Sequence, residues 1–588
     1  MWAFSMVEFI VFGLTALYFL DRLVMPPLDA VRWVKTPVNG LLIGFLLLIG
    51  LQLVPMPMSW ISIISPKTAE LKIRVAGILE ETRTSDIRPP TSGTRPSRSL
   101  SSLSTYTHAT IQEGLKLIAY LAMFFLVLNT ATSKKRIDAF CYLFVFLGLF
   151  EALYAIYAVF SLSPKVWWWQ SRVGGARYAS GTFVVSNHFA GYLEMVLGLT
   201  MGYVMTLSQK SPRLSAGLGG ARAGFQRLVG LLSPESVQPK KIFFGFSGII
   251  MGLALLLSAS RGGILSFAAA MAVMAGLFFI KTKHIKFGLF ALVFAVATFI
   301  YGLSVGMDPT LKKAEKTEGL FYRLYTSKTL IPMIRDYPIT GVGWGNFKYV
   351  YPRYVPKDHD GVSGSGYSHN DWFEAGAEVG ITGLLLMVAA YIWFLRRLIR
   401  IWLERRNRHA VGIAAGVMAG LISLGLHSFF DFNMHIPANP LTLAALLGLG
   451  YAALHRNGYE SFFYRVRKID VNRPLRVLSA LFVVMAAVLI FRPVAGHLSA
   501  ETLCPTEWNS TMNLNWTPEP GDIERAVSIN PKNADIVFKQ AETYIKLINE
   551  GNLRSSDNVD DEQSKNRLHD RAIRALETAV RLNPARTR

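Results

Sequence analysis

Long apolar runs, separated by shorter polar connections, occupy most of the chain. Each run carries few charges and is close to the roughly 20 residues that cross a bilayer as a helix. The runs do not alternate apolar and polar residues as the strands of a membrane β-barrel do. Helices are expected because a backbone in lipid must satisfy its own hydrogen bonds. The pattern predicts twelve spans, near residues 4–20, 39–64, 112–130, 139–161, 185–207, 242–260, 262–280, 287–306, 374–395, 410–430, 438–455 and 477–495.

The connections between these spans alternate in charge. Every second connection is basic, and six of them together hold 27 Lys and Arg against 7 Asp and Glu. The positive-inside rule predicts that such loops face the cytoplasm. The N-terminus, the large loop 307–373 and the tail from residue 496 are then expected on the opposite, outward face. The six basic connections are residues 21–38, 131–138, 208–241, 281–286, 396–409 and 456–476.

The composition agrees with a membrane protein. Of 588 residues, 51% are hydrophobic and only 17% are charged, against roughly 25% charged in a soluble domain. The mean hydropathy is +0.32, so a soluble enzyme is excluded. With only two cysteines, Cys141 and Cys504, a disulfide framework is not expected. Most of the net charge of +22 lies in the six basic connections, which predicts a bilayer with anionic lipid as neighbour and no nucleic acid.

Two outward segments are more than connectors. Residues 307–373 are long and aromatic, and long structured loops often carry function. They hold a helical pattern near residues 321–334 and the glycine-rich sequence GVGWGNF at 341–347. Residues 81–106, rich in Ser, Thr, Pro and Arg, are expected to be flexible. The chain is thus divided into a membrane domain, 1–495, and a polar helical tail, 496–588.

The tail contains two similar helix ends. AVSINP at 526–531 and AVRLNP at 579–584 each close an amphipathic helix with Asn-Pro. The copies are 53 residues apart, whereas a tetratricopeptide repeat has a period of about 34, so residues 551–566 are interpreted as an insertion. A tetratricopeptide-like domain that docks a protein partner is favoured, and unrelated helices are the alternative.

Arg261 is the first candidate for chemistry. It lies in SASRGG at the outward junction of two predicted spans, where two glycines allow a tight turn. A permanent, forked cation at the membrane surface suits phosphate or diphosphate oxygens. The alternative is an arginine that snorkels to the surface and marks a helix end.

The large loop supplies the second group of candidates. Arg323 and Arg335 lie on its helical segment, and SHNDWFEAGAEVG closes it with His369, Asn370 and Asp371. A histidine beside a carboxylate can take a proton from a hydroxyl. The alternative is a surface histidine, with Asn370 or Asp371 capping the next helix.

Two further outward segments hold polar residues. The loop 162–184 and the span after it carry Arg172, Arg177 and Asn187, and Asp431 lies in a short outward turn, where helix capping explains it equally well. Glu151 and Glu194 are intramembrane acids, suited either to a transporter's proton relay or to hydrogen-bonded packing. No cluster has the spacing of a metal site, and no cytoplasmic loop has a nucleotide motif. No metal or cofactor is therefore expected, and the energy must come with the substrate.

These segments together resemble the O-antigen ligase/polymerase superfamily. The resemblance covers about 180–450. It rests on SGTF and SNHFAGYL, then SASRGG, YRLYTSKTLIPMIRDYPITGVGWGNF, SHNDWFEAGAEVGITGLL and HSFFDFNMHIPAN, in this order. It implies an all-α, GT-C-like polytopic membrane enzyme with about 12 transmembrane helices, a large periplasmic loop and a helical repeat-like C-terminal domain. Such enzymes are inverting, metal-independent glycosyltransferases of the bacterial inner membrane.

The resemblance also implies a substrate and residue roles. The donor would be a glycan on undecaprenyl diphosphate, bound at the periplasmic face. Arg261, Arg323 and His369 match the family's functional positions, the two arginines at the diphosphate and the histidine at the acceptor hydroxyl. Substrate-binding candidates at less specific positions are Arg172, Arg177, Asn187, Asn370, Asp431 and Arg335.

The acceptor stays open at this point. A growing glycan, lipid A-core or a protein hydroxyl would make the enzyme a polymerase, a ligase for lipopolysaccharide or a protein O-oligosaccharyltransferase. In a different class, a polysaccharide or lipid transporter is suggested by Glu151 and Glu194, although no inverted repeat of spans is evident. A structural scaffold is suggested only by the tail.

Overall fold

The structure, a computed structural model, describes most of the chain. The predicted span 287–306 and the candidates Arg172 and Arg323 lie outside the described residues. The described residues are 2–24, 31–34, 36, 38–85, 100–167, 170–171, 177–207, 237–282, 328–355, 366–455, 466–469, 473–504, 519–550 and 561–586.

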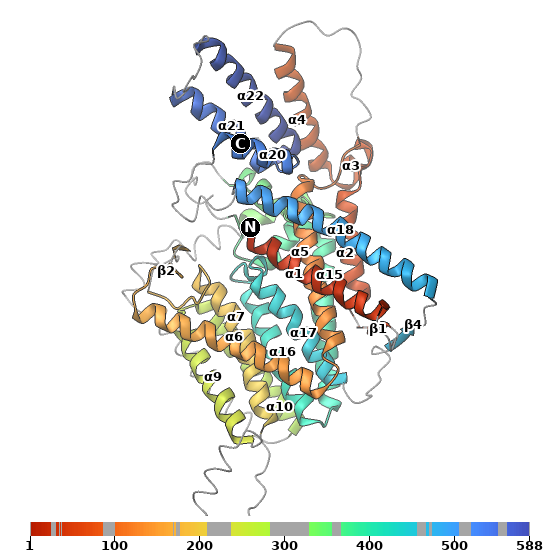
Figure 1. Cartoon of the computed structure of the whole chain (residues 1–588), viewed down its shortest axis with the longest axis vertical. Coiled ribbons are helices and arrows are strands. Elements are labelled where there is room, and N and C mark those ends of the chain that lie inside the picture. The colour runs from red at the N-terminus through yellow and green to blue at the C-terminus, as the bar shows by residue number, and fades with distance from the viewer. Residues whose placement is uncertain are drawn as a thin grey trace, which may run out of the picture.

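The described chain is mainly helical, which confirms an all-α polytopic membrane fold (Figure 1). Among the described helices, seven are long and apolar enough to cross a membrane. These are α5 (Thr107–Thr130), α6 (Lys134–Phe160), α9 (Val237–Leu257), α10 (Arg261–Thr282), α15 (Asp371–Glu404), α16 (Arg408–His427) and α18 (Arg473–Leu503). Three more coincide with predicted spans: α1 (Trp2–Val24), α7 (Ser186–Thr206) and α17 (Ala438–His455). The count of twelve spans stays a prediction.

The predicted span 39–64 is broken into two helices. α2 (Asn39–Leu53) ends before Pro55, and α3 (Met58–Ile64) begins after Pro57. Proline removes a backbone donor and clashes with the preceding turn of a helix, so Pro55 and Pro57 together end α2. A polar helix, α4 (Pro66–Ser85), follows.

Small residues let α7 and α16 approach each other closely. A Cβ added at Gly202 would lie 2.3 Å from the carbonyl oxygen of Gly412, and one at Gly198 would lie 2.9 Å from that of Gly416. Close backbone packing between small residues is a common basis of helix association in membranes. This pair forms the centre of the largest buried cluster, to which α6, α9, α10, α15 and α17 also contribute.

α15 is kinked where the glycine-rich turn packs against it. Gly380 has φ 67° inside the helix. The Ile381 N–H donates instead to Pro338 O at 2.8 Å, and the Val342 N–H donates to Ala377 O at 3.0 Å. A Cβ on Gly341 would lie 2.2 Å from the backbone of Glu378. The glycine-rich segment therefore holds the N-terminal part of α15, before the kink at Gly380, in its position.

The tail packs against the large loop. Its helices are α20 (Pro520–Ile529), α21 (Ala534–Glu550) and α22 (Asp561–Leu582), and they lie beside α4 at the top of Figure 1. The Tyr349 hydroxyl donates to Asp535 at 2.7 Å, and the Arg353 guanidinium donates to Pro584 O at 3.0 Å. Asp535 follows the Asn-Pro of the first copy, and Pro584 is the proline of the second copy, so the two copies meet the same loop.

The predicted boundary at 495/496 falls inside α18, which continues to Leu503. The tetratricopeptide character of the tail stays a prediction.

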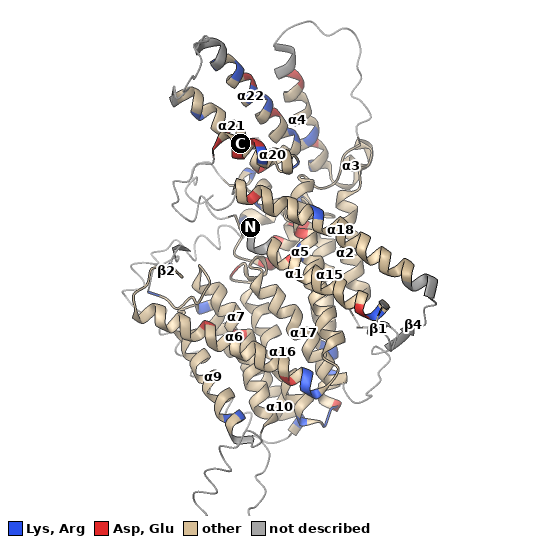
Figure 2. Cartoon of the chain, in the orientation of Figure 1, with Lys and Arg blue, Asp and Glu red and all other residues tan. Residues whose placement is uncertain are grey.

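The remaining elements are short. Strand β1 (Val31–Val34) pairs antiparallel with β4 (Val466–Ile469), and β2 (Lys165–Val166) pairs with β3 (Gln170–Ser171). The large loop contains a helical stretch at 328–336, α14 (Phe347–Val350) and η1 (Tyr351–Arg353), and two more 3-10 turns are η3 (Asn433–His435) and η4 (Pro584–Arg586). Figure 2 shows Lys and Arg at the lower ends of α9 and α10, both from connections predicted to be cytoplasmic, and mixed charge on the tail.

Candidate functional site

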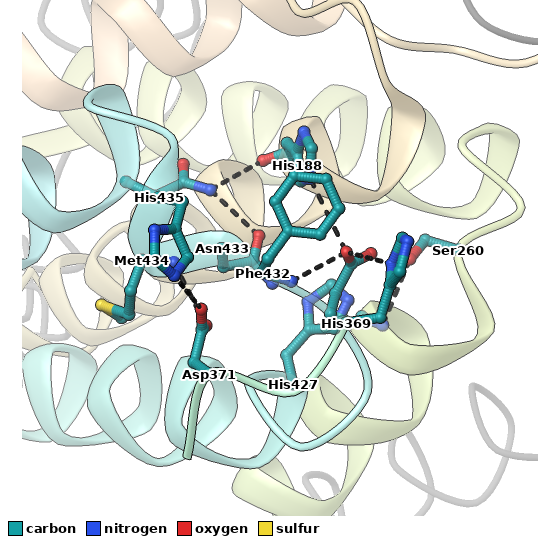
Figure 3. Close-up of polar contacts among 12 residues, drawn as sticks. His188, Ser260, His369, Asp371, His427, Phe432, Asn433, Met434 and His435 are labelled. Atoms are coloured by element: carbon teal, nitrogen blue, oxygen red, sulfur yellow. Dashed lines mark hydrogen bonds and ion pairs between the residues drawn. The ribbon is translucent and has the colours of Figure 1, made fainter. Parts of the chain in front are cut away.

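A buried carboxylate, Asp431, joins two histidines from distant parts of the chain. His369 Nδ1 lies 3.3 Å from Asp431 Oδ1, and His188 Nε2 lies 3.6 Å from the same oxygen. His188 is on the first turn of α7, His369 directly precedes α15, and Asp431 is in the turn between α16 and α17. Three segments that the sequence predicts to face outward thus meet at one point (Figure 3).

Asp431 is held as a carboxylate. Burial by itself would raise its pKa, but the contacts with His188 and His369 outweigh burial and hold the pKa well below its usual range. The ring of Phe432 packs edge-on against both histidines, with centroid separations of 4.5 and 4.8 Å. A fixed negative charge at Nδ1 favours a proton on that nitrogen of His369 and leaves Nε2 as the atom that can accept a proton.

The backbone at His369 is strained and firmly held. Its φ is 56°, in the left-handed region that a residue with a Cβ rarely adopts. On one side, Ser368 Oγ accepts from the Asn370 N–H at 3.1 Å. On the other, Asn370 Oδ1 accepts from the Phe373 N–H at 3.1 Å. Asn370 is thus the N-cap of α15, as the capping interpretation expects, and it sets the direction in which His369 leaves the helix.

A second set of charged side chains, Glu374, Asp371 and His435, supports the segment around His369. Glu374 Oε2 accepts from the Ser368 N–H at 2.7 Å, and Glu374 Oε1 pairs with His435 Nε2 at 3.1 Å. Asp371 Oδ1 is 3.8 Å from the same His435 nitrogen. Burial would lower the pKa of His435, but these carboxylates and Glu378 raise it to about 10, so His435 is a cation at neutral pH. Figure 3 shows Asp371 and His435 on one side of Phe432 and His369 on the other.

Arg261 begins α10 beside the histidine cluster. Ser260 Oγ accepts from the Gly263 N–H at 3.3 Å and caps the helix. A Cβ on Gly262 would lie 2.9 Å from the imidazole of His427, so the two glycines are needed for this approach. Figure 3 shows Ser260 and His369 on the same side of Phe432. The exposed Arg261 side chain therefore stands at a helix N-terminus, where the helix dipole favours anions.

His427 is fixed from the membrane side by Glu194. The carboxylate accepts from Ser423 Oγ at 2.6 Å and lies 3.2 Å from His427 Nδ1. Glu151 is also engaged, since it accepts from the N–H and the hydroxyl of Thr182 at 2.8 and 2.7 Å. Both intramembrane acids therefore have the hydrogen-bonded packing that the sequence left as one of two alternatives.

The other sequence candidates are placed less centrally. Arg177 is exposed two residues before Ala179, whose N–H donates to Leu257 O at 3.1 Å, so it lies at the α9–α10 corner. Asn187 is half-buried directly before His188. Arg335 is exposed on the 328–336 helix, whose other face packs into the large loop.

The site residues predicted from the sequence do not include His188, His427 or the Glu374–His435 pair, although His188 and His435 lie in segments that were singled out as polar. The signal for His188 was present, because SNH at 186–188 and SHN at 368–370 both put an asparagine beside a histidine at the start of a helix. The partner of each histidine lies far away in the sequence, so spacing could not pair them. Within the described ranges, His, Cys, Asp and Glu side chains do not form a group of three or more that could hold a metal ion.

Comparisons with known proteins find one family. Residues 246–388 match the family described as O-antigen ligase. The matched stretch begins in α9 and runs through Arg261, the glycine-rich turn and His369 into α15. No curated protein matches the chain.

Proposed function

Because the chain belongs to the O-antigen ligase/polymerase superfamily through residues 246–388, we propose that it transfers or polymerises a glycan from undecaprenyl diphosphate in the assembly of a surface polysaccharide. The family and the membrane helices already indicate an enzyme that moves lipid-linked glycans in a bilayer. The donor carrier, the periplasmic face and an inverting, metal-independent mechanism are parts of the proposal. The contact of His369 with the buried Asp431, beside the N-terminus of α10, is the observation that carries it.

In this reaction, His369 is the base. Its Nδ1 proton points to Asp431, and Nε2 takes the proton of the acceptor hydroxyl as that oxygen attacks the anomeric carbon. One carbon–oxygen bond forms on one face of the sugar, while the bond to the lipid diphosphate breaks on the other, which inverts the anomeric centre. The lipid diphosphate leaves with the bonding electron pair, and the imidazolium is stabilised by Asp431.

The leaving group needs positive charge. Arg261 and the N-terminus of α10 are suited to the diphosphate, because a cation and the positive end of a helix dipole stabilise negative charge that develops there. Arg323 is proposed as the second cation on the family resemblance. Arg172, Arg177, Asn187 and Arg335 remain substrate-binding candidates, with Arg177 supported by its place at the α9–α10 corner.

We propose that this site lies on the periplasmic face of the bacterial inner membrane. The support is the charge of the loops, since Lys240, Lys241 and Lys281 lie at the other ends of α9 and α10. On the same ground, residues 1–495 form the membrane domain and 496–588 a periplasmic tail that contacts the large loop and is available to a protein partner.

A transporter is the alternative from another class. It was suggested by the two intramembrane acids Glu151 and Glu194. Both accept hydrogen bonds from neighbouring side chains, which favours a packing role for them over a proton relay. Transfer to a protein hydroxyl remains the alternative acceptor chemistry.

The test is a reconstitution of the purified chain with an undecaprenyl-diphosphate-linked glycan. A growing glycan, lipid A-core and a serine-containing polypeptide are added in separate reactions. Release of undecaprenyl diphosphate that depends on one of the three acceptors is expected and identifies the reaction. Donor that stays intact with all three, while the chain carries it across the vesicle membrane, would contradict the proposal and favour the transporter.

A further inference from the structure

A cavity of about 350 Å³ is lined in part by Asp371 and His435. Figure 3 shows these two residues on the other side of Phe432 from Ser260, the residue before Arg261. The walls of the cavity come from α2, α5, α15, α16 and α17, and none of its lining residues belongs to α7 or α10. Most of the wall is apolar, as with Phe45, Phe124, Met387 and Leu443. A water-filled space of this composition between membrane helices is unfavourable, whereas an alkyl or isoprenoid chain would bury its surface there.

Part of the cavity lining is polar, and three of these residues, Asp371, Glu378 and His435, lie within electrostatic reach of one another. Glu113 and Trp344 line the cavity together with them. Two basic side chains also line the cavity, and each is paired with a carboxylate. Lys116 Nζ lies 2.6 Å from Glu113 Oε1, and His435 Nε2 lies 3.1 Å from Glu374 Oε1. The polar part of the lining therefore offers more acceptors than cations, which disfavours a phosphate.

Two buried polar atoms of the lining residues make no hydrogen bond. Asp371 Oδ1 is an acceptor on a side chain that is only 7% exposed, and His435 Nε2, at 3.8 Å, is too distant for a hydrogen bond. Trp344 Nε1 is a donor. A buried polar group without a partner costs about 1–3 kcal/mol, so such atoms indicate a ligand that completes them. A sugar hydroxyl both donates and accepts, and it suits this pair.

We propose that this cavity binds the single apolar chain of an acceptor glycolipid, with the hydroxyls of its first sugar at Asp371 and Trp344. The inference rests on the proposed glycan transfer and names the acceptor as lipid-linked. Asp371 is two residues from His369 in the sequence, so an acceptor anchored here would present its glycan to the base from the side of Phe432 opposite Ser260. Donor and acceptor would then approach the same histidine from the two sides of Phe432.

The test uses a photoreactive alkyl glucoside with a diazirine in its chain. The full-length protein is placed in vesicles of phosphatidylethanolamine and phosphatidylglycerol, and an alkyl diphosphate with the same diazirine chain serves as the second probe. The glucoside is expected to label peptides of α5 and α15, with much weaker labelling there by the diphosphate.

Filling the cavity should remove this labelling. Ala390 on α15 and Ala444 on α17 line the cavity from two different helices. Ala389, the exposed neighbour of Ala390, does not line it. Ala390→Phe or Ala444→Phe is expected to reduce labelling about tenfold, because overpacking a filled site typically costs more than the free energy of a tenfold change. Ala389→Phe is the matched control and should label like the unaltered chain.

Three outcomes would overturn the proposal. The first is equal labelling of the Ala390→Phe, Ala444→Phe and Ala389→Phe variants. The second is labelling of α5 and α15 by the diphosphate probe as strongly as by the glucoside. The third is loss of glucoside labelling on Arg261→Ala, which would mark the cavity as the donor's site. Because labelling needs no turnover, these results are distinguishable from a failure of the proposed transfer, which would show as intact donor in the reconstitution.

Discussion

Glu374 accepts a hydrogen bond from the backbone N–H of Ser368 at 2.7 Å, one residue before His369. The other oxygen of the same carboxylate pairs with His435. The backbone directly before His369 is therefore held by a side chain that lies inside α15.

Glu374→Gln should slow transfer without unfolding the protein. A glutamine has one oxygen where the carboxylate uses two, so it can keep the Ser368 contact or face His435, but not both. We expect kcat to fall by about tenfold with an unchanged KM for the donor, measured as lipid diphosphate released. The exposed Glu70, which pairs with Lys67 and Arg74 on α4, gives the matched control Glu70→Gln. Equal rates for the two variants would show that Glu374 does not position the base.

Asp431→Asn should affect the base directly. The amide can present a donor to His369 Nδ1 and favour the wrong tautomer. Loss of an oriented general base typically costs about 10²–10⁴-fold in rate, and the variant should fall in this range while it still inserts in the membrane. Asp336, which accepts a hydrogen bond from the Tyr354 hydroxyl in the large loop, provides the control Asp336→Asn. A full rate in Asp431→Asn would remove Asp431 from the mechanism.

Gly262→Ala should destabilise the junction of α10 with α16. The added Cβ would lie 2.9 Å from His427, whose ring is itself held by Glu194. Overpacking of this kind costs about 1–3 kcal/mol, so Tm should fall and transfer should weaken. Gly276 lies on the same helix with no atom within 4 Å of its Cβ position. Gly276→Ala should leave Tm unchanged, and a similar Tm for both variants would contradict the close approach.

The His435 cation should make stability depend on alkaline pH. Its pKa rises from an ordinary 6.5 to about 10 in the folded chain, so the folded state binds this proton more tightly than the unfolded state. The stabilisation is fully present below pH 6.5 and is lost as pH rises through about 10. The Tm difference between the unaltered chain and His435→Gln should therefore shrink between pH 8 and 11. A difference that stays constant over this range would show that His435 is not a buried cation.

The sequence predicts the elements of this fold better than their contacts. Apolar runs of the length of a bilayer give α5, α6 and α16 directly, since a backbone in lipid has few alternatives to a helix. The kink at Gly380 could not be predicted, because it depends on carbonyl groups of the turn around Pro338, some forty residues earlier. The docking of the tail on Tyr349 and Arg353 is long-range in the same way.

The candidate site shows the same limit. Arg261 and His369 could be selected from their local sequence, as a cation beside two glycines and a histidine before a helix. The Asp431 carboxylate could be selected but not paired with His188, since helices from three regions must pack before these side chains meet. The Glu374–His435 pair lies behind the site and carries no local sequence signal.

The most direct test of the central claim is release of undecaprenyl diphosphate by the purified chain with a lipid-diphosphate-linked glycan and its acceptor. The unaltered protein is compared with Arg261→Ala, His369→Ala and the exposed control Lys67→Ala. The account predicts release by the unaltered chain and the control, and its loss in both site variants at equal amounts of inserted protein. Release at the full rate by Arg261→Ala and His369→Ala would contradict it.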